Sequence, residues 1–203
     1  MWITWKHDDQ KIPWPPSFEQ KVDIFYHRLL GWQLHVADLV SNGGKPLAKV
    51  GEELETLRTI PHSGFAVLQI CLSYFETIAQ YQRVNPSTKC DGDFFREGVH
   101  AVFPELGKRR PAEIDAFLNI LYKNARCGLY HSSMTRVGVG LGQPGNNIAM
   151  AFNPANKQLV IDPHVLPRTL KAHLESYRQQ LLDSNNSDLR RNFEMQFNKD
   201  NGF

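Results

Sequence analysis

The chain has 203 residues, of which 41% are hydrophobic and 22% charged, and this is the balance of a globular protein. This composition excludes wholesale disorder, and no apolar run approaches the ~20 residues that a transmembrane helix needs. The 23 Lys and Arg residues nearly balance the 21 Asp and Glu residues, so the net charge is only +2. A general electrostatic field for nucleic acid is therefore excluded, and any anion site has to be local. The length predicts one domain over residues 1–203.

The cysteines favour a reducing compartment. Cys71, Cys90 and Cys127 are odd in number and widely spaced, so they predict neither a disulfide framework nor a paired-cysteine metal site. The first residues contain no apolar segment of signal-peptide length. We therefore expect a cytoplasmic protein that does not associate with a membrane.

The first third of the chain predicts a long helix behind an extended segment. Residues 1–16 are rich in aromatic residues and proline and predict an extended lead-in. Ser17 followed by Gln20 has the pattern of a capping box. Apolar residues then recur every three or four positions as far as Leu39, which predicts a helix of about six turns ending at residues 41–44. A shorter helix is predicted over residues 52–60.

The middle of the chain predicts the centre of the core. Residues 65–83 are apolar on most of the circumference of a helix, which is typical of a helix buried among others. A further helix is predicted from Asp91 to the residue before Pro104. Pro111 suits the first turn of another helix, whose apolar face continues to Leu129.

The last third of the chain predicts a hairpin followed by helices. Over residues 136–162, apolar residues alternate with glycine or other small residues, and a turn at 153–157 precedes a returning strand at 158–161. Residues 163–197 resume the helical period and predict the C-terminal helices. The predicted fold class is therefore mainly α, an up-and-down bundle of about five helices with a small inserted β-hairpin.

Several familiar functional motifs are missing from the sequence. No glycine loop with a Gly-Lys-Ser/Thr ending and no paired-histidine zinc helix occurs. Residues 138–142 are rich in glycine, but they lack the spacing of a dinucleotide-binding loop and do not open a helix. His100, His164 and His173 lack the spacing of metal ligands. We therefore expect no metal and no cofactor.

The segment LYKNARCGLYHSSMTR, residues 121–136, holds the best candidate site. In it, Arg126 is followed by four residues and then by His131. The segment resembles the signature helix of the HEPN superfamily (higher eukaryotes and prokaryotes nucleotide-binding domains), in which four to six residues separate an Arg from a His. Two other pairs have a fitting spacing, Arg28 with His35 and Arg168 with His173. Only the Arg126 pair lies late in a strongly patterned helix, beside Gly128 and before a turn of small residues.

The resemblance covers residues 17–135 in architecture and about ten residues in motif. It implies a single HEPN-like helical domain. In that superfamily, a helical bundle dimerises so that two Arg–His pairs line one cleft, and many active members cleave RNA without a metal. The resemblance therefore implies a homodimer and a metal-independent endoribonuclease of toxin or defence type. It also implies RNA as the substrate and a neutralising protein as a partner.

The residue types suit this chemistry. Cleavage of RNA through its own 2′-hydroxyl needs a proton removed, charge stabilised at phosphorus and the leaving oxygen protonated. His131 can transfer protons near neutral pH, and Arg126 offers planar donors that match phosphate oxygens. The further candidates are Lys123 and Tyr130 as phosphate contacts, Asn124 as a hydrogen-bond donor and Glu76 as the residue that orients Arg126.

An alternative function stays open. Positions five apart on a regular helix differ by ~140° around its axis, so Arg126 and His131 meet only through the reach of Arg126, a helix end near Gly128, or a partner subunit. Arg126 in an ordinary ion pair and His131 at a helix C-terminus would account for both residues without catalysis. In addition, Cys127 stands where active members of the superfamily commonly have a polar residue. The alternative is a non-catalytic helical module that binds RNA, a nucleotide or a partner protein.

Overall fold

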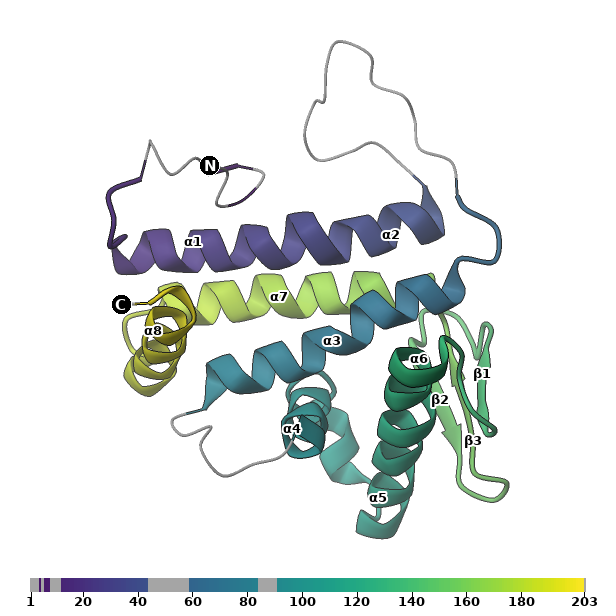
Figure 1. The fold of residues 1–203 in the computed structure, drawn as a ribbon. Helices are drawn as coiled ribbons and strands as arrows, with labels where there is room; N and C mark the ends of the chain where they lie inside the picture. Colours follow the sequence, from purple (N-terminus) through teal and green to yellow (C-terminus); the bar gives the residue numbers. More distant parts are fainter. Residues whose placement is uncertain (1–3, 5, 8–11, 44–58, 84–90, 203) are drawn as a thin grey trace.

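A computed structural model describes residues 4, 6–7, 12–43, 59–83 and 91–202, and these residues are mainly helical, as predicted (Figure 1). The helices are α1 (Phe18–Leu29), η1 (Leu30–Leu34), α2 (His35–Asn42), α3 (Gly64–Gln82), α4 (Asp91–Val102), η2 (Pro104–Lys108), α5 (Pro111–Ile120), η3 (Leu121–Arg126), α6 (Cys127–Ser132), α7 (Leu166–Leu182) and α8 (Ser187–Asn201). The strands are β1 (Val139–Leu141), β2 (Met150–Asn153) and β3 (Gln158–Ile161). Segments η1 and η3 are π-helical, and η2 is a 3₁₀ helix.

The first helix begins where the capping box predicts. The Gln20 backbone N–H donates to Ser17 Oγ at 3.3 Å, and the Ser17 N–H donates to Gln20 Oε1 at 2.8 Å. Helix α1, segment η1 and helix α2 follow one another as one rod, which confirms the predicted long helix. It ends at Gly43, whose φ of 71° is readily adopted only by glycine. Most of the helix predicted over residues 52–60 lies outside the described residues.

Helix α3 forms the centre of the core, as its apolar circumference predicts. It packs against α2, α4, α7 and α8. The side chains of Leu72, Tyr74 and Phe75 are fully buried. Its burial on several sides means that the polar side chains it carries need partners from neighbouring helices.

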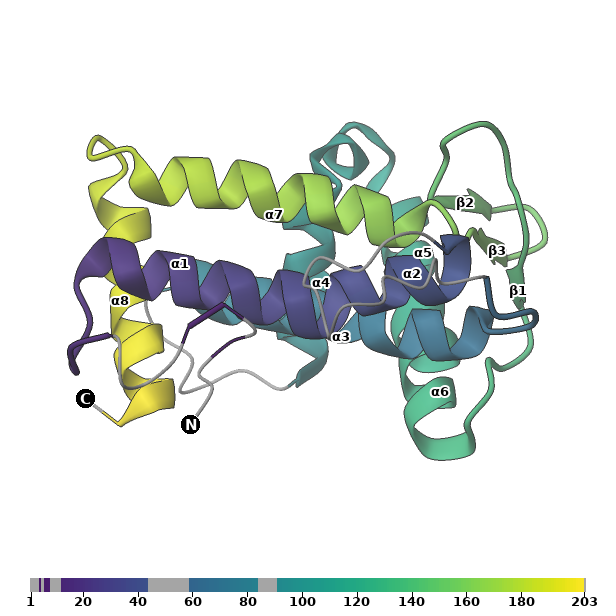
Figure 2. The same ribbon diagram turned by 90° about the horizontal axis from the view of Figure 1, so that it is seen from above.

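The helices do not form a simple up-and-down bundle. The rod of α1 and α2 runs alongside α7 and above α3, whereas α5–α6 and α8 run across them at opposite ends of the molecule (Figures 1 and 2). The predicted mainly helical class therefore holds, but the helix directions differ from the prediction. Crossing angles depend on how side-chain ridges fit between two helices, and a helical period within one segment does not contain that information.

The predicted hairpin forms two strands of a three-stranded sheet. Strands β2 and β3 pair antiparallel, with Phe152 opposite Leu159, which confirms the turn and the returning strand. Strand β1 adds to the other edge of β3 in parallel, with Val139 opposite Leu159, so the strand order is β1-β3-β2. Alternation along the chain identified the strands. The parallel pairing of β1 with β3 joins strands that are separated in the sequence by β2, and such pairing leaves no local signal.

The C-terminal helices differ from the predicted bounds. Asp162 Oδ1 accepts hydrogen bonds from the backbone N–H groups of His164 and Val165, at 2.8 and 3.2 Å. Asp162 therefore caps a turn that precedes the helix, and α7 itself begins at Leu166. Helix α8 extends to Asn201, beyond the predicted end at residue 197. Within the described ranges, no helix combines the length and the apolarity needed to span a bilayer.

Gly98 allows α4 to approach α3 closely. A Cβ atom at this position would overlap the backbone carbonyl of Phe75. We expect Gly98→Ala to lower the free energy of unfolding by about 2 kcal/mol or more in urea titrations, because overpacking outweighs the gain of ~1 kcal/mol from helix propensity. The matched control is Gly107→Ala, where a Cβ atom meets nothing within 4 Å. Equal effects of the two substitutions would contradict close packing at Gly98.

Stability should fall in acid because His173 is buried in its neutral form. Burial lowers the pKa of His173 to about 4, although its hydrogen bond to the Ala101 backbone opposes this. The Tyr74 hydroxyl lies 2.8 Å from His173 Nδ1. The unfolded chain binds a proton near pH 6.5 and the folded chain does not, so stability is lost as the pH falls from about 6.5 to 4, by up to about 3 kcal/mol. In urea titrations across this range, His173→Asn should show a smaller loss, and an unchanged loss would contradict the assignment.

Candidate functional site

Arg126 lies at a change of helix type. The helix that starts at Pro111 widens into the π-helical segment η3, in which the Cys127 N–H donates to the Tyr122 carbonyl five residues earlier. It then returns to the α-helical geometry of α6. Wider turns of this kind are rare and often occur at functional sites. Nothing in the periodicity of the sequence predicted this turn.

The guanidinium of Arg126 is held by Glu76 of the central helix α3. Arg126 Nη2 donates to Glu76 Oε2 at 3.0 Å, and Arg126 Nε lies 2.9 Å from Glu76 Oε1. Both side chains are 17% exposed. Burial by itself lowers the pKa of Arg126, but the hydrogen bond and the charge of Glu76 outweigh it and raise the pKa above its usual value. Arg126 is therefore a permanent cation with a fixed direction.

Tyr130 covers the other side of this guanidinium. The guanidinium carbon of Arg126 lies 4.2 Å from the centre of the Tyr130 ring, a cation–π contact between residues four apart on one helix face. The Tyr130 side chain is nevertheless 41% exposed. Its hydroxyl lies 3.5 Å from the Gln69 carbonyl of α3. Tyr130 thus touches Arg126 and still presents ring surface to solvent.

His131 is exposed in the last turn of α6. Among the residues that the structure describes, none makes a hydrogen bond, ion pair or ring contact with its side chain. Residues 127–132 are α-helical, so His131 lies ~140° around the axis from Arg126, which faces Glu76. A single copy of the chain therefore does not bring the imidazole to the guanidinium.

The remaining predicted site residues have different surroundings. Lys123 is exposed, which is compatible with a phosphate contact. Asn124, in contrast, uses its amide within the molecule, since Nδ2 donates to the Val137 carbonyl at 2.8 Å. Cys127 is partly buried beside Tyr122, and burial together with this thiol raises the pKa of Tyr122. These contacts give Asn124 and Cys127 structural roles.

The predicted site does not coincide with the apolar cavity beside the sheet. That cavity has a volume of about 400 Å³ and is lined by Phe103, Phe117 and Phe152, with Arg109 also among its lining residues. Arg126 and His131 are not among them. Over the described ranges, no group of three or more His, Cys, Asp or Glu side chains is arranged to hold a metal ion.

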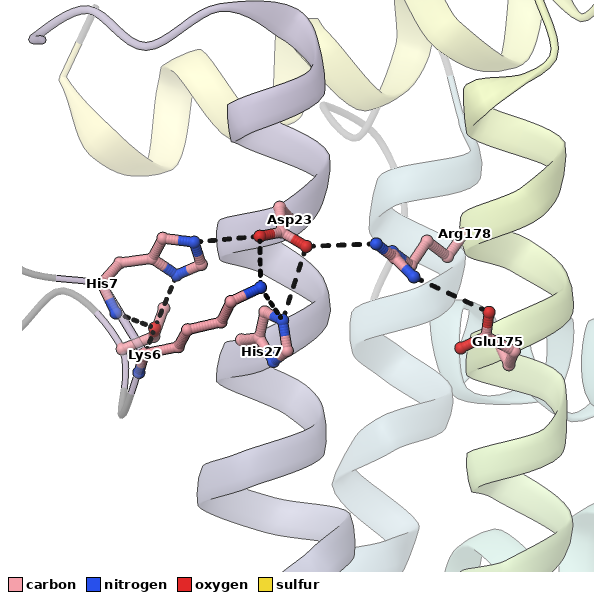
Figure 3. Close-up of polar contacts among 7 residues, drawn as sticks. Lys6, His7, Asp23, His27, Glu175 and Arg178 are labelled. Atoms are coloured by element: carbon pink, nitrogen blue, oxygen red, sulfur yellow. Dashed lines mark hydrogen bonds and ion pairs between the residues drawn. The ribbon is translucent and has the colours of Figure 1, made fainter. Parts of the chain in front are cut away.

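A second polar cluster, which the sequence reasoning missed, lies at the far end of the molecule from α6 (Figures 1 and 3). The Asp23 carboxylate on α1 is contacted by Lys6 at 3.2 Å, by His7 Nε2 at 2.9 Å and by Arg178 of α7 at 3.2 Å. His27 Nε2 lies 3.4 Å away, and burial lowers the pKa of His27 to about 4. No spacing along the chain links residues 6 and 7 with residue 178, so only the fold could show this cluster.

The geometry of this cluster makes it a structural clamp. Thr4 Oγ1 lies 2.8 Å from His7 Nδ1, and His7 Nε2 contacts Asp23, which is the order of groups in a hydroxyl nucleophile with its base. However, Thr4 is fully buried, and its oxygen accepts from the backbone N–H groups of Lys6 and His7 at 3.0 and 2.9 Å. Its lone pairs are therefore engaged and out of reach of a substrate. The cluster fastens Lys6 and His7 to α1, and Arg178 joins α1 to α7.

Comparisons with protein-family models, with curated proteins and with solved structures find no match. The function of the site therefore has to be inferred from the chemistry of its own residues. Those residues are a carboxylate-bound guanidinium, an aromatic ring and an exposed imidazole at one helix end.

The Glu76–Arg126 contact should be measurable as a coupling energy. We expect a double-mutant cycle with Glu76→Gln and Arg126→Gln to give a coupling of about 1–3 kcal/mol in urea unfolding, because both partners are largely buried and charged. A control cycle pairs Asp188→Asn with Arg191→Gln, an ion pair at 3.0 Å between side chains that are 82% and 60% exposed. This pair should couple by less than about 1 kcal/mol. A Glu76–Arg126 coupling no larger than the control would contradict a fixed guanidinium.

Proposed function

We propose that the chain is a HEPN-like, metal-independent endoribonuclease of toxin or defence type, which uses Arg126 and His131 at a cleft between two copies. The observation that carries the proposal is that Arg126 is ion-paired and His131 is exposed to solvent. Arg126, at the end of η3, is charged and held by Glu76, while His131, five residues later in α6, is exposed. A fixed cation and an exposed imidazole are the residue types that phosphoryl chemistry at a 2′-hydroxyl uses.

The geometry supports a shared cleft rather than a site in one copy. Arg126 and His131 point to different sides of α6, so a second copy would have to supply the group that one copy lacks. The turn that follows α6 also exposes apolar side chains. Met134 is 55% exposed and Val137 94% exposed, next to the partly exposed ring of Tyr130. Apolar surface of this kind favours contact with another protein chain.

Each residue has a defined role in the proposed reaction. His131 removes the proton from the 2′-hydroxyl, or returns a proton to the departing 5′-oxygen. Arg126 stabilises the charge on the non-bridging phosphate oxygens, and Glu76 keeps it oriented. Lys123 and Tyr130, both exposed, supply further contacts to the RNA phosphates in this proposal.

A second function is favoured by a different observation. The donors of Arg126 already face Glu76, and Cys127 stands where a polar residue is common in active members of the superfamily. A non-catalytic module that binds RNA, a nucleotide or a neutralising partner protein through its exposed residues would be compatible with these features. Salt-sensitive binding of RNA without cleavage would identify this second function.

The nuclease proposal predicts that cleavage depends on His131 and not on a metal. We expect the purified protein to cleave single-stranded RNA in EDTA, and His131→Ala to reduce the rate by ~10²-fold or more. The control is His62→Ala, at another exposed histidine, which should cleave at the wild-type rate. Equal cleavage by His131→Ala and wild type, or no cleavage by either, would contradict the proposal.

A mixing experiment extends this test to the shared cleft. Arg126→Ala and His131→Ala are each expected to be inactive. When they are mixed and allowed to exchange subunits, half of the dimers combine one copy of each variant. If Arg126 of one copy acts with His131 of the other, one of the two sites in these mixed dimers is intact, and about a quarter of the wild-type activity should return. A strictly monomeric protein, or a mixture without activity, would contradict the shared cleft.

A further inference from the structure

The turn after α6 folds back onto the helix that carries Arg126. Helix α6 ends at Ser133, whose φ of 58° reverses the chain, and Gly138 has a φ of 90°, which favours glycine. The Gly138 carbonyl accepts from the Leu159 N–H at 2.8 Å, so the far end of the turn is fastened to the sheet. Residues 133–138 are thus held at both ends.

Asn124 fastens the middle of this turn. Its backbone carbonyl accepts from the Arg136 N–H at 2.8 Å, and its side-chain amide donates to the Val137 carbonyl at 2.8 Å. Gly128 makes room for the returning chain, since a Cβ atom there would lie 2.7 Å from the Met134 carbonyl. The same Cβ atom would lie 3.3 Å from Cγ of Arg136, so the Arg136 stem passes over Gly128.

Arg136 differs from the arginines around it because its charge is uncompensated. Its side chain is exposed. Within the described ranges, only Arg109 and Arg136 are arginines without a hydrogen bond, ion pair or ring contact of their side chains. The other described arginines are engaged by carboxylates or, in Arg28, by the Asn201 amide oxygen.

The uncompensated charge of Arg136 matters because the Glu76–Arg126 pair leaves the candidate site with little positive charge. Glu76 compensates the positive charge of Arg126, so the pair carries little net charge. A phosphate backbone in this region therefore needs a further cation. Arg136 supplies an uncompensated guanidinium from a backbone position that Asn124 fixes, beside the same helix.

We propose that Arg136 is a second phosphate contact for single-stranded RNA, placed over Gly128 by the Asn124 clamp. This inference rests on the proposed RNA function and adds the residue that holds the strand. Arg126 meets the reacting phosphate, whereas Arg136 meets a neighbouring phosphate and stays ion-paired with it throughout. Arg136 should therefore affect RNA binding more than the rate of the chemical step.

The test is a binding titration with a probe that cannot be cleaved. Fluorescent single-stranded RNA with 2′-O-methyl groups is titrated with wild type, Arg136→Ala and the matched control Arg109→Ala at several salt concentrations. We expect Arg136→Ala to weaken binding about 5–10-fold at low salt, and to reduce the slope of log affinity against log salt by about 0.7, the value for one lost contact to a single strand. Arg109→Ala should match wild type in affinity and slope.

Two more variants test the charge of Arg136 and the clamp that holds it. Arg136→Lys keeps the charge and should retain the wild-type slope of log affinity against log salt. Asn124→Ala keeps Arg136 but removes the side-chain hydrogen bond to the Val137 carbonyl, and should weaken binding by an amount between wild type and Arg136→Ala. Circular dichroism and thermal unfolding should be unchanged for Arg136→Ala, because its side chain is exposed and without partners.

The possible outcomes separate this inference from the function on which it rests. If wild type binds the probe and Arg136→Ala has the same affinity and slope as Arg109→Ala, the role of Arg136 is wrong and the proposed RNA function stands. If wild type does not bind the probe at any salt concentration, both are wrong. A weaker affinity of Arg136→Ala with an unchanged salt slope would also overturn the phosphate contact.

Discussion

A carboxylate on the most buried helix constrains the rest of the candidate site. Helix α3 is surrounded by other helices, so the charge of Glu76 requires a partner there. Arg126 supplies it from the helix that crosses the end of the molecule. This ion pair therefore joins α3 to the segment η3 and fixes the direction in which the guanidinium points. Tyr130 then covers the face of the guanidinium that Glu76 leaves free.

This constraint also shapes the function that the site supports. A guanidinium that is already paired contributes direction more than net charge, and among the described residues no contact joins it to the exposed imidazole of His131. The proposed nuclease function therefore needs two further contributions, an unpaired cation to hold a phosphate backbone and a second copy to complete the pair. We propose that Arg136 supplies the first and that the exposed apolar side chains after α6 favour the second.

The chain encodes its local structure with little ambiguity. The Ser17 capping box, the apolar circumference of residues 65–83 and the turn before β3 each act within a few residues, and all three appear in the structure where they were predicted. The sequence offered Glu76 as a residue to orient Arg126, but only the structure shows that the two side chains meet. In contrast, the parallel pairing of β1, the crossing directions of α5–α6 and α8, and the Asp23 cluster join residues far apart in the chain.

The sequence by itself determined that the chain is mainly helical, where the first long helix begins, and which residue types are available for phosphoryl chemistry, since these follow from periodicity, capping and side-chain chemistry. Only the tertiary structure decided which of those residues meet. It joined Arg126 to Glu76, left His131 exposed and used the Asn124 amide inside the molecule, and among the described residues none pairs with the Arg136 side chain. The physical reason is that direction around a helix axis and contact between distant segments depend on packing, which no local pattern records.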